Sequence, residues 1–155
     1  MTAAEALVAQ ARRAGAMIAT AESCTGGLLA GAITEVPGAS DVFDRGFVTY
    51  SNAAKRELLG VSEATLTAHG AVSEPTAAEM ASGALARSAA THAVAITWIA
   101  GPGGSEHKPE GRVCFGLAAM AGTRSETVEF GALGRPEVRR RSVEHAMGLL
   151  RQALG

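Results

Sequence analysis

Short apolar runs alternate with helical patterns along the first hundred residues, and this alternation limits the possible folds more than any other feature. The runs at 17–21 (MIATA) and 46–50 (GFVTY), and the run that begins at Ala93 (AVAITWIAG), have the length and composition of buried strands. Helical patterns occupy the remaining segments at 2–14, 26–34, 51–60, 62–70 and 74–91. This order favours parallel strands covered by helices.

The last third of the chain departs from the alternation. Residues 112–120 (RVCFGLAAM) and 124–130 (RSETVEF) flank Ala121, Gly122 and Thr123, a pattern typical of a β-hairpin. A helix over 136–154 follows, with apolar residues along one face and arginines elsewhere. The whole chain therefore predicts an α/β fold: one three-layer α/β/α domain over residues 1–155 with a mixed central sheet.

Composition excludes several classes of function. Hydrophobic residues make up 47% of the 155 positions, enough for a sizeable core, and the net charge is −1. Such a balance offers no broad basic face for nucleic acid, and no apolar run approaches the ~20 residues that span a bilayer. Cys24 and Cys114 lie far apart without a metal-ligand spacing. We expect a cytoplasmic protein without a metal site, a nucleic-acid partner or a membrane partner.

The first candidate for chemistry is the stretch TAESCTGGLLAG at residues 20–31. Ligands of open α/β sheets bind at the carboxyl ends of strands, and Ser23 follows the first strand directly. The amides of Thr25, Gly26 and Gly27 would then be unpaired donors at a helix start, able to hold an anion or an oxyanion. The alternative is structural, with Ser23 or Thr25 acting only as a helix cap.

A serine nucleophile needs a base, and the histidines offer no obvious one apart from His107 in a glycine-rich loop. Lys55 in TYSNAAK is the better candidate. It falls in the first turn of a predicted helix capped by Ser51 or Asn52, where the helix dipole disfavours an ammonium. Tyr50, at the end of the preceding strand, has a hydroxyl that can relay a proton or hold Ser23. The alternative for Lys55 is a solvated helix lysine.

Two further segments suit an anionic ligand. The loop GPGGSEHKPEG at 101–111 has glycines that let backbone amides converge on a phosphate, although it matches neither the Walker nor the Rossmann pattern. Arg135 and Arg139 in GRPEVRRR carry guanidinium groups that match phosphate oxygens. A plain surface loop and a solvated helix face are the respective alternatives.

Taken together, these motifs closely resemble the CinA C-terminal domain family. The segments that carry the resemblance occur in the family's order: TAESCTGGLLAG, VPGASDVFDRGFVTYSNAAKRELLGV, AHGAVSEPTAAEMASGA and IAGPGGSEHKPEGRV. Enzymatic members of that family are nicotinamide mononucleotide deamidases, which release ammonia and form nicotinic acid mononucleotide. The resemblance implies the same α/β/α fold and the same small-molecule substrate, without a metal or an organic cofactor.

The resemblance also implies roles for individual positions. Ser23 corresponds to the nucleophile, and Tyr50 and Lys55 correspond to its proton-transfer partners. The substrate-binding positions are Thr25, Gly26, Gly27, Gly101, Gly103, Gly104, Ser105, Arg135 and Arg139. We expect a nicotinoyl ester on Ser23 as the intermediate.

Trp98 departs from the family pattern, because many members have glycine at this position. The indole of Trp98 would stack on a ligand ring, fill a void or narrow the pocket, and Arg112 stands where a small polar residue is usual. Two other functions therefore stay open: a nucleotide-binding module without catalysis, and a partner protein in competence or repair. For the quaternary state, two-fold symmetry is commonest among soluble oligomers, and we expect a homodimer or a higher homo-oligomer.

Overall fold

The computed structural model describes residues 1–99 and 108–155, and within them five strands form one mixed sheet in the order β2-β1-β3-β4-β5. Strands β1 (Ile18–Glu22), β2 (Phe43–Val48) and β3 (His92–Trp98) are parallel. The predicted hairpin, β4 (Arg112–Ala119) and β5 (Gly122–Glu129), extends the sheet in antiparallel fashion. The chain moves from β1 outward to β2 and then crosses back to β3, so a topological switch point lies beside β1.

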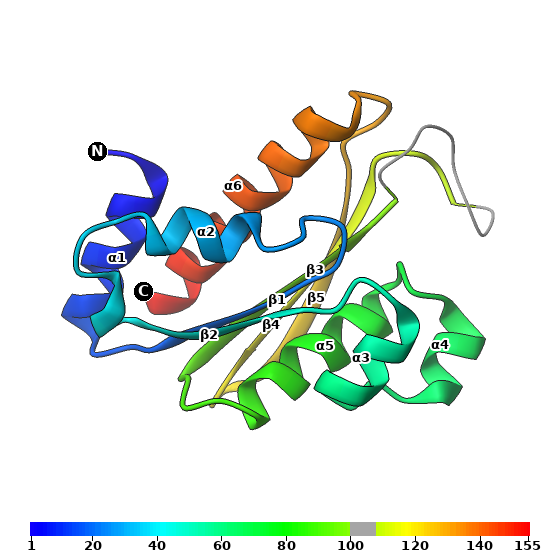
Figure 1. Cartoon of the computed structure of the whole chain (residues 1–155), viewed down its shortest axis with the longest axis horizontal. Coiled ribbons are helices and arrows are strands. Elements are labelled where there is room, and N and C mark those ends of the chain that lie inside the picture. Colours follow the sequence, from blue (N-terminus) through cyan, green and yellow to red (C-terminus); the bar gives the residue numbers. More distant parts are fainter. Residues whose placement is uncertain (100–107) are drawn as a thin grey trace.

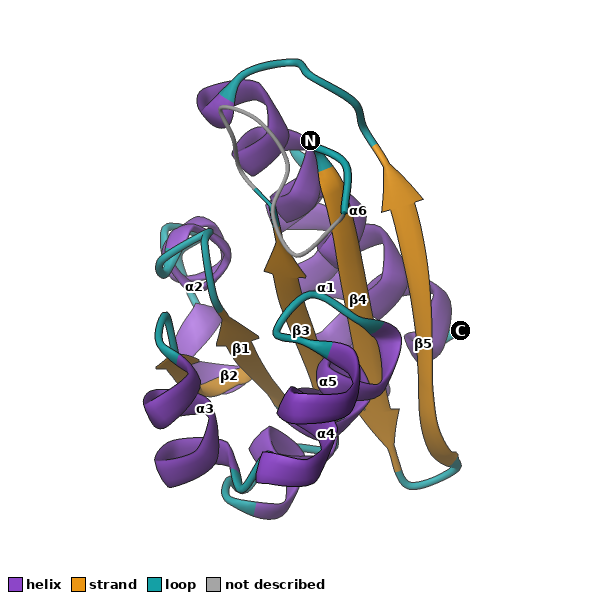
Figure 2. Ribbon diagram, turned by 90° about the vertical axis from the view of Figure 1, so that its right-hand side faces the viewer, coloured by secondary structure: helices purple, strands orange, loops and turns teal. Residues whose placement is uncertain are grey.

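Helices cover both faces of this sheet and confirm the three-layer α/β/α prediction. On one face lie α1 (Ala3–Ala14), α2 (Leu28–Thr34) and the long α6 (Arg135–Leu154), as Figure 1 shows above the strands. The other face carries α3 (Asn52–Leu59), α4 (Glu63–His69) and α5 (Glu74–Ala86). A 3-10 turn, Ala39–Asp41, precedes β2. The view along the layers in Figure 2 shows β2 and β5 at the two edges of the sheet.

Local residues account for where the helices begin and end. Ser51, rather than Asn52, caps α3 by accepting a hydrogen bond from the Ala54 amide, and Gly60 ends that helix in the left-handed conformation. The helix predicted from residue 26 begins instead at Leu28, because Gly26 and Gly27 have φ of 58° and 103°, outside the helical region. Helix α5 ends at Ala86 rather than near residue 91.

The two faces of the sheet differ in side-chain size. Val94, Ile96 and Phe115 point toward the α1, α2 and α6 layer and are fully buried there. Toward α5 the strands present mainly alanine, together with Gly116. Because these side chains are small, α5 lies so close to β4 that a Cβ at position 116 would overlap the carbonyl oxygen of Ala77. The alanine-rich sequence of α5 is therefore a packing requirement.

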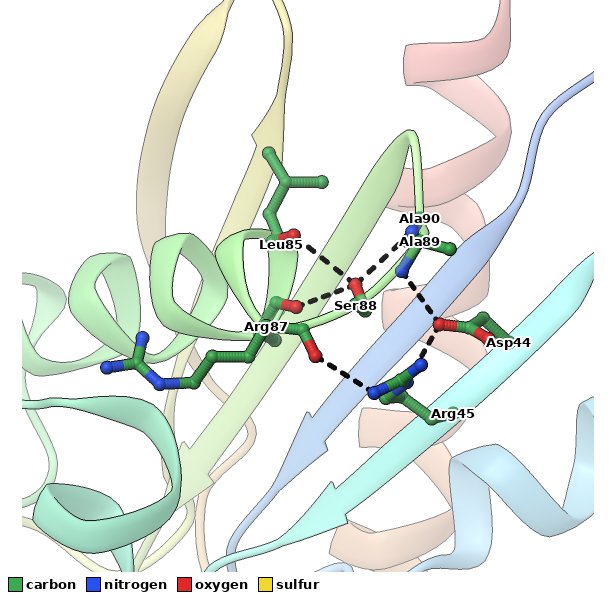
Figure 3. Close-up of polar contacts among 8 residues, drawn as sticks. Asp44, Arg45, Leu85, Arg87, Ser88, Ala89 and Ala90 are labelled. Atoms are coloured by element: carbon green, nitrogen blue, oxygen red, sulfur yellow. Dashed lines mark hydrogen bonds and ion pairs between the residues drawn. The ribbon is translucent and has the colours of Figure 1, made fainter.

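A group of polar contacts holds the edge strand β2 to the connection between α5 and β3 (Figure 3). The Asp44 carboxylate accepts hydrogen bonds from the Ala89 amide at 2.9 Å and from Arg45 Nε at 2.8 Å. Arg45 Nη1 donates to the Arg87 carbonyl at 3.2 Å. The Ala89 amide, aided by Arg45, holds the pKa of Asp44 below its ordinary value. These contacts secure the start of β2, whose other end leads into the site described below.

We predict opposite effects for two glycine substitutions. Gly116→Ala should lower the free energy of unfolding by about 1–3 kcal/mol or more, because backbone atoms of α5 cannot move aside easily. Gly148→Ala, on the exposed side of α6 with no atom near the new Cβ, should raise it by about 0.5–1 kcal/mol. Urea denaturation followed by circular dichroism measures both, and a Gly116→Ala protein as stable as wild type would contradict the close packing of α5.

Candidate active site

Ser23 lies in a tight turn between β1 and α2, at the carboxyl edge of the parallel strands. Its amide donates to the Ile96 carbonyl of β3 at 3.0 Å, and its own carbonyl accepts from the Gly26 amide at 2.9 Å. The Leu28 amide closes the turn on the Thr25 carbonyl at 3.0 Å. These bonds hold Ser23 at the switch point, where its side chain is almost fully buried.

Lys55 brings its amine directly to Ser23. From the first turn of α3, Lys55 Nζ lies 3.3 Å from Ser23 Oγ, and Lys55 is only 1% exposed. Nζ also contacts two carbonyl oxygens just beyond the end of β2, those of Thr49 at 3.1 Å and Tyr50 at 3.3 Å. A neutral amine has two N–H groups for the two carbonyls and one lone pair for the serine proton. The arrangement is thus compatible with Lys55 as a base.

Glu22 has a role that the sequence did not reveal. Its buried carboxylate accepts hydrogen bonds from the amides of Leu29 at 3.0 Å and Ala30 at 3.1 Å, so it binds the N-terminus of α2. This charge compensates the helix dipole and leaves the helix amides unavailable to a substrate. The only sign of this in the sequence is an acidic residue shortly before a helix that carries no side-chain cap.

The open backbone amides near Ser23 differ in part from the expected set of Thr25, Gly26 and Gly27. The Gly26 amide is already bonded to the Ser23 carbonyl, so it cannot serve as an open donor. Within the described part of the chain, the amides of Cys24, Thr25 and Gly27 have no acceptor. They lie in the turn immediately after the nucleophile candidate, the usual place for oxyanion donors. The prediction from sequence therefore missed the Cys24 amide as an open donor.

Tyr50 lies beside the site, but not in the expected way. Its backbone carbonyl contacts Lys55 Nζ, whereas its side chain is 63% exposed and its hydroxyl has no hydrogen bond to Ser23 or Lys55. Successive residues of an extended segment point to opposite sides, and Thr49 occupies the buried side. The predicted contact between the Tyr50 hydroxyl and Ser23 is therefore wrong for this structure.

Arginines from α6 approach the other side of the turn. Arg139 Nη2 lies 3.4 Å from the Thr25 carbonyl, while its buried Nε has no acceptor among the described residues. The hydroxyl of fully buried Thr25 is likewise without a described partner. Arg135, the first residue of α6, is exposed at the same edge. Cationic groups and unsatisfied polar atoms thus gather next to Ser23, as an anionic ligand requires.

Cys24 is a poor nucleophile despite its position. Burial raises the pKa of its thiol, although the Ser23 hydroxyl and the charges of Arg135, Lys55 and Arg139 act in the opposite direction. The thiol lies 3.3 Å from the Trp98 carbonyl and can donate to it. Because a nucleophilic cysteine needs its thiolate, Ser23 is the better nucleophile candidate in this turn.

Trp98 is 2% exposed and belongs to the hydrophobic cluster on the α6 side, with Val113 and Val138. This location agrees with the void-filling interpretation.

Some predicted site residues lie outside the described part of the chain: Gly101, Gly103, Gly104, Ser105 and His107. Within the residues that are described, no three His, Cys, Asp or Glu side chains group as a metal site would require. No helix in that same part has the length and hydrophobicity to cross a bilayer.

Comparison with known proteins places these features in context. The sequence model of the CinA C-terminal domain matches residues 1–154. The nicotinamide-nucleotide amidohydrolase PncC of Escherichia coli K12 is 51% identical over 147 residues, which cover 94% of this chain and 89% of that protein. A CinA-like protein of Mycolicibacterium paratuberculosis is 56% identical over 146 residues, covering 91% of this chain.

Two of the matched relatives are much longer than this chain. It spans about a third of the CinA-like protein of M. paratuberculosis (34%) and of a competence-damage inducible protein of Symbiobacterium thermophilum (35%). Among solved structures, the competence/damage inducible protein CihA from Agrobacterium tumefaciens superposes with a TM-score of 0.92 at 49% identity. That match covers 99% of this chain and 96% of the other.

We predict that Glu22→Gln lowers the free energy of unfolding by about 1–2 kcal/mol. A glutamine keeps one acceptor oxygen but turns an NH₂ group toward the second helix amide. Glu35→Gln, an exposed change at the other end of α2, is the matched control and should be close to neutral. Thermal and urea unfolding measure both variants, and equal stability of the two would argue against the capping role of Glu22.

Proposed function

This chain belongs to the CinA C-terminal domain family, and from that premise we propose that it is a nicotinamide-nucleotide amidohydrolase. The substrate is nicotinamide mononucleotide, and the products are nicotinic acid mononucleotide and ammonia. The observation that carries the proposal is the buried contact of 3.3 Å between Lys55 Nζ and Ser23 Oγ. The identity to PncC over 94% of the chain supports the choice of substrate.

In the first step, Lys55 acts as the general base. Its neutral amine takes the proton of the Ser23 hydroxyl while Oγ forms a bond to the carboxamide carbon of the substrate. Negative charge develops on the carbonyl oxygen. The open amides of Cys24 and Thr25 stabilise it, and the Gly27 amide of the same turn is a third open donor.

In the second step, the carbon–nitrogen bond of the carboxamide breaks. The Lys55 ammonium returns its proton to the leaving nitrogen, so that ammonia departs and an ester remains on Ser23. Lys55 then takes a proton from water, which attacks the ester carbon and releases the carboxylate product. Ser23 Oγ recovers its proton from Lys55, and the amine is neutral again. The scheme balances without a metal or an organic cofactor.

The phosphate of the nucleotide is assigned to the α6 side of the turn. Arg135 and Arg139 supply guanidinium groups there, and the buried Thr25 hydroxyl offers a further hydrogen-bonding group. The loop with Gly101, Gly103, Gly104 and Ser105 completes the binding set as the family resemblance implies. We further propose a single domain over 1–155, a cytoplasmic location and a homodimer or higher homo-oligomer.

Ammonia release from nicotinamide mononucleotide tests this function. The wild-type chain should release ammonia, and Ser23→Ala and Lys55→Met should each reduce kcat by at least about 10³-fold. Methionine has nearly the length of lysine without its amine, so the buried site stays filled. Arg56→Met, one residue along α3 on the surface, is the matched control and should stay close to wild type.

Circular dichroism of each variant separates lost chemistry from lost folding. A wild-type chain that binds the nucleotide in calorimetry but releases no ammonia would favour a binding module instead. Turnover that survives in Ser23→Ala would contradict the covalent mechanism while leaving the hydrolase activity itself in place.

A further inference from the structure

The outer strand β5 leaves one edge of the sheet open for pairing (Figure 2). Among the described strands it bonds only to β4, in a regular antiparallel register along its whole length, Gly122–Glu129. An edge of this kind presents unpaired N–H and C=O groups to which a further strand can bind. The opposite edge strand, β2, is shorter, and its pairing with β1 skips Asp44. Such a bulge protects an edge from pairing, and the pairing of β5 contains none.

On the face toward α6, β5 carries two opposite charges spaced two residues apart. The Glu126 carboxylate contacts His145 Nε2 of α6 at 2.6 Å, and only one of its two oxygens makes this contact. Arg124 is exposed and has no ion-pair partner within the described residues. Both side chains lie on one face, because side chains alternate along a strand. This pattern suits a neighbouring strand that carries the same two charges in reverse order.

On the face toward α5, β5 carries short side chains with hydroxyl groups. Thr127 Oγ1 donates a hydrogen bond to the Glu74 carboxylate of α5 at 2.7 Å, and Ser125 Oγ donates to it at 3.3 Å. Thr123 follows in the same alternation and is exposed. Threonine and serine form favourable pairs across neighbouring strands, so this face also suits a second strand.

A second copy of the chain can bind this edge through a two-fold axis perpendicular to the sheet. The axis makes the two β5 strands antiparallel and keeps like faces together, so residues that oppose each other lie on the same face. The charges then distinguish the registers. An axis at Arg124 brings two guanidinium groups together, and an axis at Glu126 brings two carboxylates together. An axis at Ser125 places Arg124 opposite Glu126 of the partner subunit, twice by symmetry.

We propose that β5 pairs with β5 of a second copy of this chain, with Ser125 at the two-fold axis. Arg124 and Glu126 then form two equivalent ion pairs on the α6 face. Because the axis reverses the strand direction, the two Ser23 turns lie at opposite edges of the joined sheet, and the pairing covers neither of them. The inference names the surface for the homo-oligomer proposed above. It depends on no step of the chemistry, so either proposal can fail alone.

Sedimentation equilibrium of charge variants tests the pairing. Wild type should form a dimer. Arg124→Glu places like charges opposite each other in both pairs and should raise the dissociation constant of the dimer by about tenfold or more. Adding Glu126→Arg to Arg124→Glu restores opposite charges and should return the constant to within about threefold of wild type. Arg13→Glu, the same charge change in the last turn of α1, is the matched control and should not alter it.

Two results of this experiment would overturn the proposal outright. One is a monomeric wild type, and the other is a dimer whose dissociation constant is the same in wild type and Arg124→Glu. A double variant that circular dichroism shows to be folded, yet that dissociates as readily as Arg124→Glu, would refute the register with Ser125 at the axis.

Cysteine cross-linking tests the same register without changing any charge. Ser125→Cys brings two thiols together at the axis, at a Cα separation of about 4.5–5.5 Å that a disulfide spans. Thr123→Cys, on the same face, is the matched control, because its two copies lie about 14 Å apart. Oxidation with copper phenanthroline should therefore cross-link only Ser125→Cys on a non-reducing gel. Wild type, with half-buried Cys24 and buried Cys114, accounts for unrelated disulfides. Absence of a cross-linked Ser125→Cys dimer, or equal cross-linking of Thr123→Cys, would contradict the pairing.

Discussion

The contact between the buried Lys55 amine and Ser23 is the constraint on which the site depends. Burying an amine is costly unless its hydrogen-bonding groups are matched, and here the carbonyls of Thr49 and Tyr50 provide the match. Those carbonyls stand at the end of an edge strand, which the Asp44 and Arg45 contacts hold at its beginning. The position of the Lys55 amine thus depends on the whole length of β2 and on the α5–β3 connection.

Charge is distributed unevenly around the turn that holds Ser23. The carboxylate of Glu22 is directed into the start of α2, where two amides neutralise it, so it does not oppose an anionic ligand. Arginines occupy the α6 side, and the exposed apolar side chains of Leu28 and Val48 lie on the side of α2 and β2. The proposed orientation directs the anionic phosphate of the nucleotide toward these arginines and its carboxamide toward Ser23.

Much of the fold was predictable from the sequence, because it depends on local patterns. The alternation of strands and glycine-terminated helices led to the three layers, and the strand-end rule brought Ser23 and Lys55 to one edge. Finer features depend on tertiary contacts. The cap by Glu22 requires a turn of two left-handed glycines that displaces the helix start to Leu28. The outward side chain of Tyr50 follows from the burial of Thr49. Neither the Glu22 cap nor the orientation of Tyr50 can be inferred from composition or spacing.

The central claim is that Ser23 attacks the carboxamide and becomes acylated. Rapid acid quenching during turnover, followed by mass spectrometry of proteolytic peptides, tests it most directly. We predict that the peptide with Ser23 gains the mass of nicotinamide mononucleotide less ammonia, that fragmentation places the adduct on Ser23, and that Lys55→Met accumulates none. An adduct on Cys24, or full turnover without any acylated peptide in the quenched samples, would contradict this mechanism.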